Sequence, residues 1–256
     1  MAGAVSGTLP TFPLSLHCGG LAAALPISMS QFPFDAVLFD CDGVLVDSEG
    51  ITNRILTAML GEMGWQLTLE QTLGIFLGKT VLDEAPRIQA ETGHLIDEAW
   101  IERFRARRNA ALETELLPIP GAPAAVHAVH AAVQGRIAVA SGADSYKLRL
   151  QLNKTGLQDY FGENVMSGQE QARNKPWPDV YLAAARVLDV DPTRCAVVED
   201  SITGARAGVA AGATVFGYSP GGPGHSDAKA LLDVGVAHVL RDMSELPALL
   251  AGWQRG

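Results

Sequence analysis

The sequence predicts an α/β protein with a doubly wound parallel sheet and an inserted α-helical domain. From about residue 31 onward, short apolar runs alternate with longer segments of helical periodicity. This alternation is typical of parallel strands joined by crossover helices. Several of the apolar runs end directly in polar clusters, and one long segment has helical periodicity without any convincing strand. Together these observations favour one α/β core with a helical insertion.

The candidate strands are short runs of apolar, mostly β-branched or small residues. They lie at residues 36–39, 136–140, 195–198, 214–217 and 238–240, the last being the weakest. Three are followed by polar residues, at Asp40-Cys41-Asp42, Ser141-Gly142 and Glu199-Asp200-Ser201. Open α/β sheets bind their ligands at the carboxyl ends of the strands, so we expect these polar residues to converge at one edge.

The helical insertion is expected at residues 49–117. Apolar residues recur every four positions at its start, and helical patterns resume at 82–91 and 96–115. The prolines and the glycine of Pro118-Ile119-Pro120-Gly121 then stop the helix and stiffen the return to the sheet. We therefore expect a cap domain at 49–117 and a core domain at 31–48 and 118–256. A cap hinged beside a sheet edge is well placed to act as a lid.

Residues 1–30 differ in composition from the rest of the chain. They are rich in Ala, Gly, Ser and Pro and contain no charged side chain. They lack the basic start of a secretory signal, and no window in the chain approaches the length of a membrane span. We expect this segment to be a disordered extension that takes no part in the chemistry, with Met29 as a natural start.

Charge and cysteine content narrow the partners and the compartment. The chain has 256 residues, of which 48% are hydrophobic, enough for one well-filled domain and a smaller second one. Its net charge of −9 disfavours nucleic acid as a main partner. Its three cysteines, Cys18, Cys41 and Cys195, are far apart and form no Cys-x-x-Cys motif. This favours a reducing, cytoplasmic compartment over a disulfide framework or a structural zinc site. We expect a monomer or small homo-oligomer with no membrane partner.

Four carboxylates at strand ends suggest a metal site. Asp40 and Asp42 stand one residue apart, and as an isolated pair their like charges would raise one pKa and weaken a nucleophile. Glu199 and Asp200 follow another strand and are expected to join them. An all-oxygen ligand set suits hexacoordinate Mg²⁺, and a hard divalent ion also recruits a phosphate.

Neutral and positive groups are predicted at the same edge. Lys175, before Pro176, could stabilise both a carboxylate nucleophile and phosphoryl oxygens. Ser141 with the amides of Gly142 and Ala143 could supply neutral donors for those oxygens. Read alone, a Lys before Pro is most often a solvated loop residue, and Ser-Gly is an ordinary helix start. Lys175 and Ser141 become candidate site residues because they are expected at the same sheet edge as the carboxylates.

With these motifs in order, the chain resembles the haloacid dehalogenase superfamily of phosphotransferases. The resemblance is to the branch with a helical cap inserted after the first motif, close to β-phosphoglucomutase-like proteins and sugar-phosphate phosphatases. It rests on Asp40-Cys41-Asp42-Gly43-Val44-Leu45-Val46-Asp47-Ser48, Val139-Ala140-Ser141-Gly142, Lys175-Pro176-Trp177-Pro178-Asp179 and Val197-Val198-Glu199-Asp200-Ser201. These motifs extend over about residues 34 to 213 and imply a Rossmann-like core.

The resemblance implies a role for each motif. Asp40 would be the nucleophile that forms an aspartyl-phosphate, and Asp42 the general acid and then the base for water. Ser141 and Lys175 would hold phosphoryl oxygens. Asp40, the carbonyl of Asp42 and Asp200 would bind Mg²⁺, with Glu199 as a ligand or a partner of a ligand. The substrate-binding residues would be Gly43, Gly142, Ala143, Lys79 and Thr80.

Three alternative activities differ in what they require. Dehalogenases of the superfamily lack the second aspartate, so Asp42 favours phosphoryl transfer. β-Phosphoglucomutases carry an arginine in a Gly-Ile-Ser-Arg type segment of the cap, where this chain has Gly78-Lys79-Thr80-Val81. Lys79 lacks the planar bidentate fork of arginine. We expect a Mg²⁺-dependent phosphatase acting on a small phosphorylated metabolite, a sugar or sugar-acid phosphate; a phosphomutase and a non-catalytic binding protein remain as alternatives.

Overall fold

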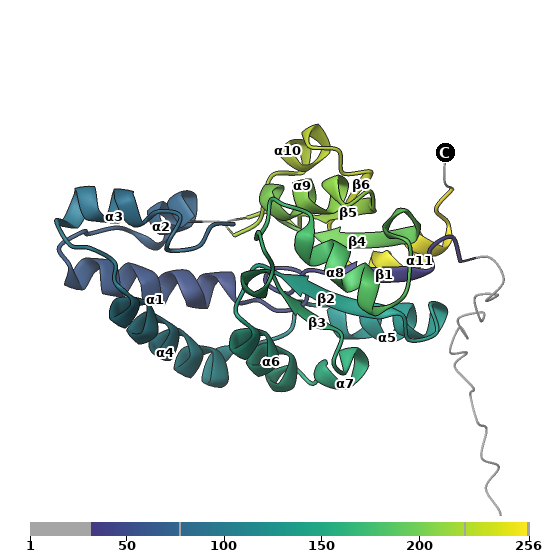
Figure 1. Cartoon of the computed structure of the whole chain (residues 1–256), viewed down its shortest axis with the longest axis horizontal. Coiled ribbons are helices and arrows are strands. Elements are labelled where there is room, and N and C mark those ends of the chain that lie inside the picture. The colour runs from purple at the N-terminus through teal and green to yellow at the C-terminus, as the bar shows by residue number, and fades with distance from the viewer. Residues whose placement is uncertain (1–31, 77, 223, 255–256) are drawn as a thin grey trace, which may run out of the picture.

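The computed structural model describes residues 32–76, 78–222 and 224–254, which form an α/β structure around one parallel sheet (Figure 1). Within these residues the sheet has six strands in the order β3-β2-β1-β4-β5-β6. The strands are β1 Ala36–Phe39, β2 Ile137–Ser141, β3 Val165–Ser167, β4 Cys195–Glu199, β5 Thr214–Tyr218 and β6 His238–Leu240. The expected fold class is confirmed. The expectation for residues 1–30 lies outside the described residues.

Strand β3 and helix α2, Leu69–Phe76, are among the elements of the described chain that the sequence prediction did not name. Strand β3 has three residues and pairs with β2 alone, so it is too short to show an apolar pattern. Helix α2 lies in a segment for which no helix was predicted. Its start carries a reciprocal pair of hydrogen bonds, in which the Thr68 amide donates to Gln71 Oε1 at 2.8 Å and the Gln71 amide donates to Thr68 Oγ1 at 3.2 Å. This is a capping box, a signal that was present in the sequence.

The strand order places a topological switch point between β1 and β4. From β1 the chain moves outward through β2 to β3, and then crosses to β4, β5 and β6 on the other side. The crevice at such a reversal is where open α/β sheets bind ligands. Phe39 of β1 is in register with Val198 of β4, so the next residues, Asp40 and Glu199, emerge side by side.

Helices cover both faces of the sheet (Figure 1). On one face, side chains such as Val37 and Phe39 pack under α5 (Ala122–Ala132), α6 (Ser145–Lys154), α7 (Gln158–Phe161) and α11 (Leu246–Ala251). On the other face, Leu38 and Val197 pack under α8 (Asp179–Val187), α9 (Ile202–Ala210) and α10 (Ala228–Asp233). The alternation of side chains along β1 explains why both faces are apolar.

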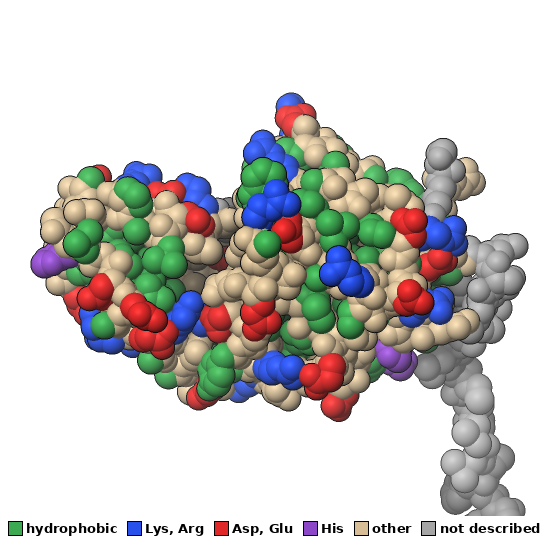
Figure 2. Space-filling model, viewed as in Figure 1, with side chains coloured by type: hydrophobic (Ala, Val, Ile, Leu, Met, Phe, Trp, Pro, Cys, Tyr) green, Lys and Arg blue, Asp and Glu red, His purple; other side chains and the backbone are tan. Residues whose placement is uncertain are grey.

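The remaining helices form a separate group with its own core. They are α1 Glu49–Glu62, α2, α3 Ala85–Thr92 and α4 Glu98–Glu115, and all fall within residues 49–117. Leu60, Ile88 and Trp100 are among the buried side chains of this group. The two connections to the sheet run together, since Val46 bridges Pro118 and the Asp47 amide donates to the Leu117 carbonyl at 3.0 Å. Figure 2 shows this group as a smaller lobe beside the larger lobe that contains the sheet.

None of the helices among the described residues is both long and apolar enough to span a bilayer.

Candidate active site

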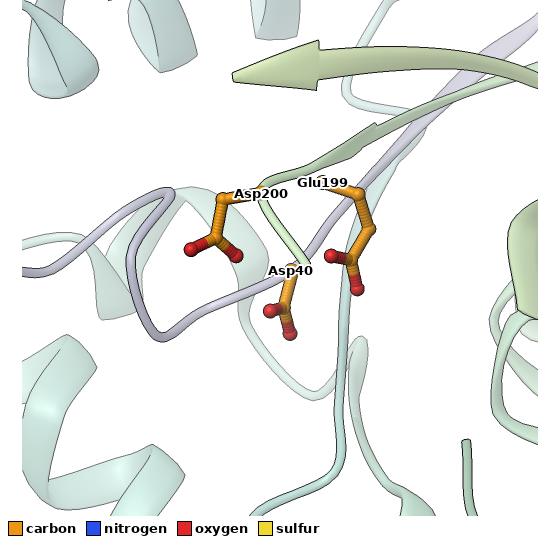
Figure 3. Close-up of side chains that lie close together, drawn as sticks. All are labelled: Asp40, Glu199 and Asp200. Carbon is orange, nitrogen blue, oxygen red and sulfur yellow. The ribbon is translucent and has the colours of Figure 1, made fainter. Parts of the chain in front are cut away.

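Three carboxylates gather at the ends of β1 and β4 (Figure 3). Asp40, Glu199 and Asp200 each offer an oxygen within 4.8 Å of the others, and all three residues are buried. Burial, reinforced by the neighbouring carboxylates, raises the pKa of Asp40 to about 7 even though Lys175 opposes the shift. The same causes raise the pKa of Asp200 well above its usual value. Ionisation of all three carboxylates together is therefore unfavourable in these surroundings.

Lys175 places a positive charge against this cluster. Its Nζ donates to Asp40 Oδ1 at 2.9 Å and to Glu199 Oε1 at 2.7 Å, and only 7% of its side chain is exposed. Burial would lower the pKa of Lys175, but the two carboxylates outweigh it and raise that pKa above its usual range. The lysine that sequence motifs placed near the nucleophile candidate does lie against it.

Glu199 is held on both carboxylate oxygens. Its Oε1 accepts from Lys175 and from the Tyr181 hydroxyl at 3.0 Å, while its Oε2 accepts from the amide and the hydroxyl of Ser201 at 2.9 and 3.0 Å. A side chain at position 204 would overlap the Glu199 carboxylate, so Gly204 is needed there. Tyr181 was not among the residues singled out from the sequence.

The loop that carries Lys175 is fastened to the turn after β2. Asn174 Nδ2 donates to the Gly142 carbonyl at 3.0 Å, and Asn174 Oδ1 accepts from the Lys175 amide at 2.8 Å. The Lys175–Pro176 peptide is cis. Sequence reasoning missed Asn174, although it directly precedes Lys175 in the motif. Its side chain links the lysine loop to the Ser141 turn.

Ser141, Gly142 and Ala143 lie where the sequence predicted them, at the end of β2 and the approach to α6. The Ser141 hydroxyl accepts from the Ala143 amide at 3.2 Å, which closes the turn. Asp144 then caps α6, because its side chain accepts from the Lys147 amide at 2.9 Å. Strand end and helix start are thus joined by a tightly bonded turn.

Asp42 faces a different set of partners from Asp40. Its Oδ1 and Oδ2 each accept from Lys147 Nζ at 2.8 Å, and Oδ1 also accepts from Gln151 Nε2 at 2.7 Å and from the Ser48 hydroxyl. Burial would raise the pKa of Asp42, but the charge of Lys147 and these hydrogen bonds lower it to about 2. Asp42 is therefore ionised in this arrangement.

Sequence reasoning missed Lys147 and Gln151. They stand four residues apart, on one face of α6, and that spacing is visible in the sequence. The sequence does not show that this face meets Asp42, which lies 105 residues away from Lys147.

The backbone of Gly43 lies close to the Asp200 carboxylate. Its φ is +76°, a left-handed conformation that favours glycine, and a side chain there would overlap the Asp200 carboxylate. The Gly43 carbonyl accepts from His225 Nε2 at 3.2 Å. Gly43 is not among the residues that line the cavity described next.

A cavity of about 540 Å³ opens at this edge of the sheet, between the strand ends and the helices of the other lobe. From the core it is lined by Asp40, Asp42, Ser141, Gly142, Ala143, Lys175 and Asp200. From residues 49–117 its polar lining includes Glu49, Lys79, Thr80, Arg105 and Arg108. Lys79 is paired with Glu84 at 2.5 Å, and the Thr80 hydroxyl donates to Asp83 at 2.8 Å. The cavity has the size of a site for a small molecule.

Glu49, at the start of α1, is a cavity residue that the sequence did not reveal. Its Oε2 accepts from Asn53 Nδ2 at 2.9 Å. Burial, with a smaller contribution from Asp42, raises the pKa of Glu49 from its ordinary 4.5 to about 7. The unfolded chain therefore loses this proton at a lower pH than the folded protein does, so stability falls as the pH rises from about 4.5 to about 7.

Glu49→Gln is expected to stabilise the protein at pH 8 relative to wild type, and to do so much less at pH 5. Gln cannot ionise, so the cost that wild type incurs between its unfolded pKa near 4.5 and its folded pKa near 7 disappears. We expect the difference in unfolding free energy to grow by on the order of 1 to 3 kcal/mol between the two pH values. Urea denaturation in EDTA measures it. Exposed Glu98, changed to Gln, is the control, and an equal difference at both pH values for Glu49→Gln would contradict the argument.

The chain is similar in sequence to known proteins. A family model described as haloacid dehalogenase-like hydrolase matches residues 34–212. The chain is 33% identical over 183 residues to 6-phosphogluconate phosphatase of Escherichia coli (strain K12), covering 71% of this chain and 81% of that protein. It is 32% identical over 181 residues to hexitol phosphatase B of the same strain, covering 69% and 79%.

A solved structure is similar over nearly the whole described chain. A HAD family hydrolase from Deinococcus radiodurans R1, crystallised with bound phosphate and sodium, superposes with a TM-score of 0.70 at 36% identity. The match covers 86% of this chain and 97% of that one.

Proposed function

The chain belongs to the haloacid dehalogenase-like hydrolases, and on that premise we propose that it is a phosphatase for a small phosphorylated metabolite, a sugar or sugar-acid phosphate. The observation that carries the proposal is the contact between Lys175 and Asp40, inside a cavity that Asp42 and Asp200 also line. A nucleophile, an acid–base residue and an electrophile meet there. The relatives' names, 6-phosphogluconate phosphatase and hexitol phosphatase B, favour a polyol substrate.

The chemistry follows from the positions of these groups. An Asp40 oxygen would attack phosphorus as the bond to the leaving oxygen breaks, giving an aspartyl-phosphate that water then cleaves. Lys175, already bonded to Asp40, would offset charge on the phosphoryl oxygens, assisted by Ser141 and the following amides. Asp42 would protonate the leaving oxygen and later accept a proton from water. The ionised form of Asp42 suits the removal of a proton from water. To protonate the leaving oxygen, Asp42 must first gain a proton.

The acidic cluster fits Mg²⁺. Its ligand atoms are carboxylate oxygens, which hard cations prefer, and a divalent ion would offset the charge of these carboxylates when they ionise. We propose that Asp40, Asp200 and the carbonyl of Asp42 would hold the ion. Because four donors already occupy the Glu199 oxygens, we assign Glu199 to holding Lys175 and the Ser201 turn. When bound, Mg²⁺ supplies charge neutralisation at the phosphoryl group.

Mg²⁺ is expected to raise the melting temperature of the wild-type protein by several degrees, and Asp200→Asn to abolish that rise. A ligand that binds the folded state alone stabilises it by mass action. Without Mg²⁺, Asp200→Asn should melt no lower than wild type, because it removes a buried carboxylate from a like-charged cluster. Thermal unfolding with MgCl₂ against NaCl at matched ionic strength tests this. Equal Mg²⁺ responses of the two proteins would contradict the assignment.

We propose residues 49–117 as a cap domain that acts as a lid and selects the substrate. The paired connections near Val46 and Pro118 form a narrow joint, and the cavity lies between this group of helices and the core. Lys79 and Thr80 are the proposed substrate contacts from the cap. Lys79 forms an ion pair with Glu84 and lacks the planar, bidentate guanidinium of arginine. A phosphomutase must bind a second phosphate group of its substrate, so these features favour a phosphatase over a mutase.

We propose the cytoplasm as the compartment, because the three cysteines lie far apart in the sequence and form no Cys-x-x-Cys motif. Monomer or small homo-oligomer remains the proposed assembly.

A panel of phosphorylated metabolites, tested with and without Mg²⁺, decides the function. It should contain 6-phosphogluconate, hexitol phosphates and β-glucose 1-phosphate, each scored separately for released phosphate and for isomerised product. We expect Mg²⁺-dependent phosphate release from a sugar or sugar-acid phosphate. Isomerised product without phosphate release would identify a mutase, and absence of both products across the panel would contradict the proposed activity.

A further inference from the structure

The environment of Asp42 contains a lysine to which none of the sequence motifs points. Lys147 Nζ lies 2.8 Å from both oxygens of the Asp42 carboxylate. Gln151, one turn further along α6, and Ser48, from the segment before α1, also donate to Asp42. Donors from two separate parts of the chain thus fix the direction of one side chain.

The pair is largely shielded from solvent at the cavity wall. The exposed fractions are 8% for the Lys147 side chain and 15% for that of Asp42, and both residues line the cavity. A charged pair so shielded from water is sensitive to loss of either partner. Lys147 bonds Asp42, whereas Lys175 bonds Asp40, so each of the two aspartates has its own lysine.

The first turn of α6 is fixed from the cap side as well. Asp144, which caps α6 by accepting from the Lys147 amide, also accepts from Arg108 Nη2 at 3.0 Å. Arg108 belongs to α4 and is buried. A chain of polar contacts therefore runs from a cap helix through Asp144 and Lys147 to Asp42.

We propose that Lys147 is a positioning residue that holds the Asp42 carboxylate where it exchanges protons with the substrate's leaving oxygen. This role rests on the proposed phosphatase function. Lys147 holds the Asp42 carboxylate in one orientation, separate from the carboxylates around Asp40. The contact between Arg108 and Asp144 links that orientation to the position of the cap.

The test compares two leaving groups on the same protein. A sugar phosphate releases an alkoxide that needs a proton, whereas 2,4-dinitrophenyl phosphate releases a stable anion that does not. The parameter is kcat/KM, which covers the steps up to departure of the leaving group. In Lys147→Met we expect kcat/KM for 6-phosphogluconate, or for the sugar phosphate the panel selects, to fall about 100-fold, the scale of general acid catalysis. For 2,4-dinitrophenyl phosphate it should stay within about threefold of wild type on the same principle.

Matched variants separate positioning from folding. The ratio of the two kcat/KM values is taken on one preparation, so it does not depend on the fraction of folded protein. Lys147→Arg keeps the cation and should recover part of the sugar phosphate rate. Exposed Lys154, in the last turn of the same helix, should tolerate Met with both rates unchanged.

Each outcome bears on a distinct claim. An equal loss on both substrates, or no loss on the sugar phosphate, overturns the role of Lys147 and leaves the phosphatase proposal intact. Wild-type protein that releases phosphate from neither substrate contradicts the proposed function, and the role of Lys147 falls with it.

Discussion

Asp40→Asn is expected to abolish Mg²⁺-dependent phosphate release from an aryl phosphate such as 4-nitrophenyl phosphate. An amide cannot form the aspartyl-phosphate, so the loss in kcat should be about 10⁴-fold or more. The fold should survive the change. Asn has the shape of Asp. The pKa of Asp40 is raised to about 7, so its ionisation destabilises the folded state, and an amide cannot ionise.

Phosphate release measured by a coupled colorimetric assay, alongside thermal unfolding, separates these two effects. Asp159→Asn serves as the control, because Asp159 is exposed on α7 outside the cavity. Unchanged activity in Asp40→Asn would overturn the mechanism. Lost activity together with a collapsed melting transition would instead show that Asp40 is needed for folding.

Lys175→Met is expected to have the second large effect, on activity and stability together. The change leaves Asp40 and Glu199 buried without the ammonium that each now contacts at 2.9 and 2.7 Å. Removal of one partner from a buried charged group typically costs about 3 to 5 kcal/mol of unfolding free energy. Activity should fall with it, because the positive charge beside the nucleophile is lost.

The pH dependence identifies the cause. Without Lys175, the pKa of Asp40 should rise further above its unfolded value, so stability should be lost as the pH rises through that folded pKa. Urea denaturation in EDTA should therefore show a larger deficit at pH 8 than at pH 5. Lys229→Met is the matched control, since the Lys229 side chain is 81% exposed and its loss should change stability by about 0.5 kcal/mol or less. A deficit equal at both pH values would point to lost packing in place of lost charge.

Much of the core site was predictable because its residues end the strands or directly follow them. Asp40, Ser141 and Glu199 stand at the end of apolar runs, and a parallel sheet must bring such ends to one edge. The contact of Lys175 with Asp40 could be expected from the four motifs in order, and so could a helical insertion after the first motif. Strand β3 was not predicted, because three residues are too few to show a periodic pattern of apolar side chains.

The sequence by itself determined the fold class, the strand-end residues and the family, because these depend on local periodicity and on neighbours along the chain. Only the tertiary structure decided that Asp42 pairs with Lys147, a residue 105 positions away whose helix face is set by how α6 packs on the sheet. It also decided that donors occupy both Glu199 oxygens and that Glu49 lines the cavity with a raised pKa. Such contacts and pKa values depend on desolvation and long-range packing, which no local pattern encodes.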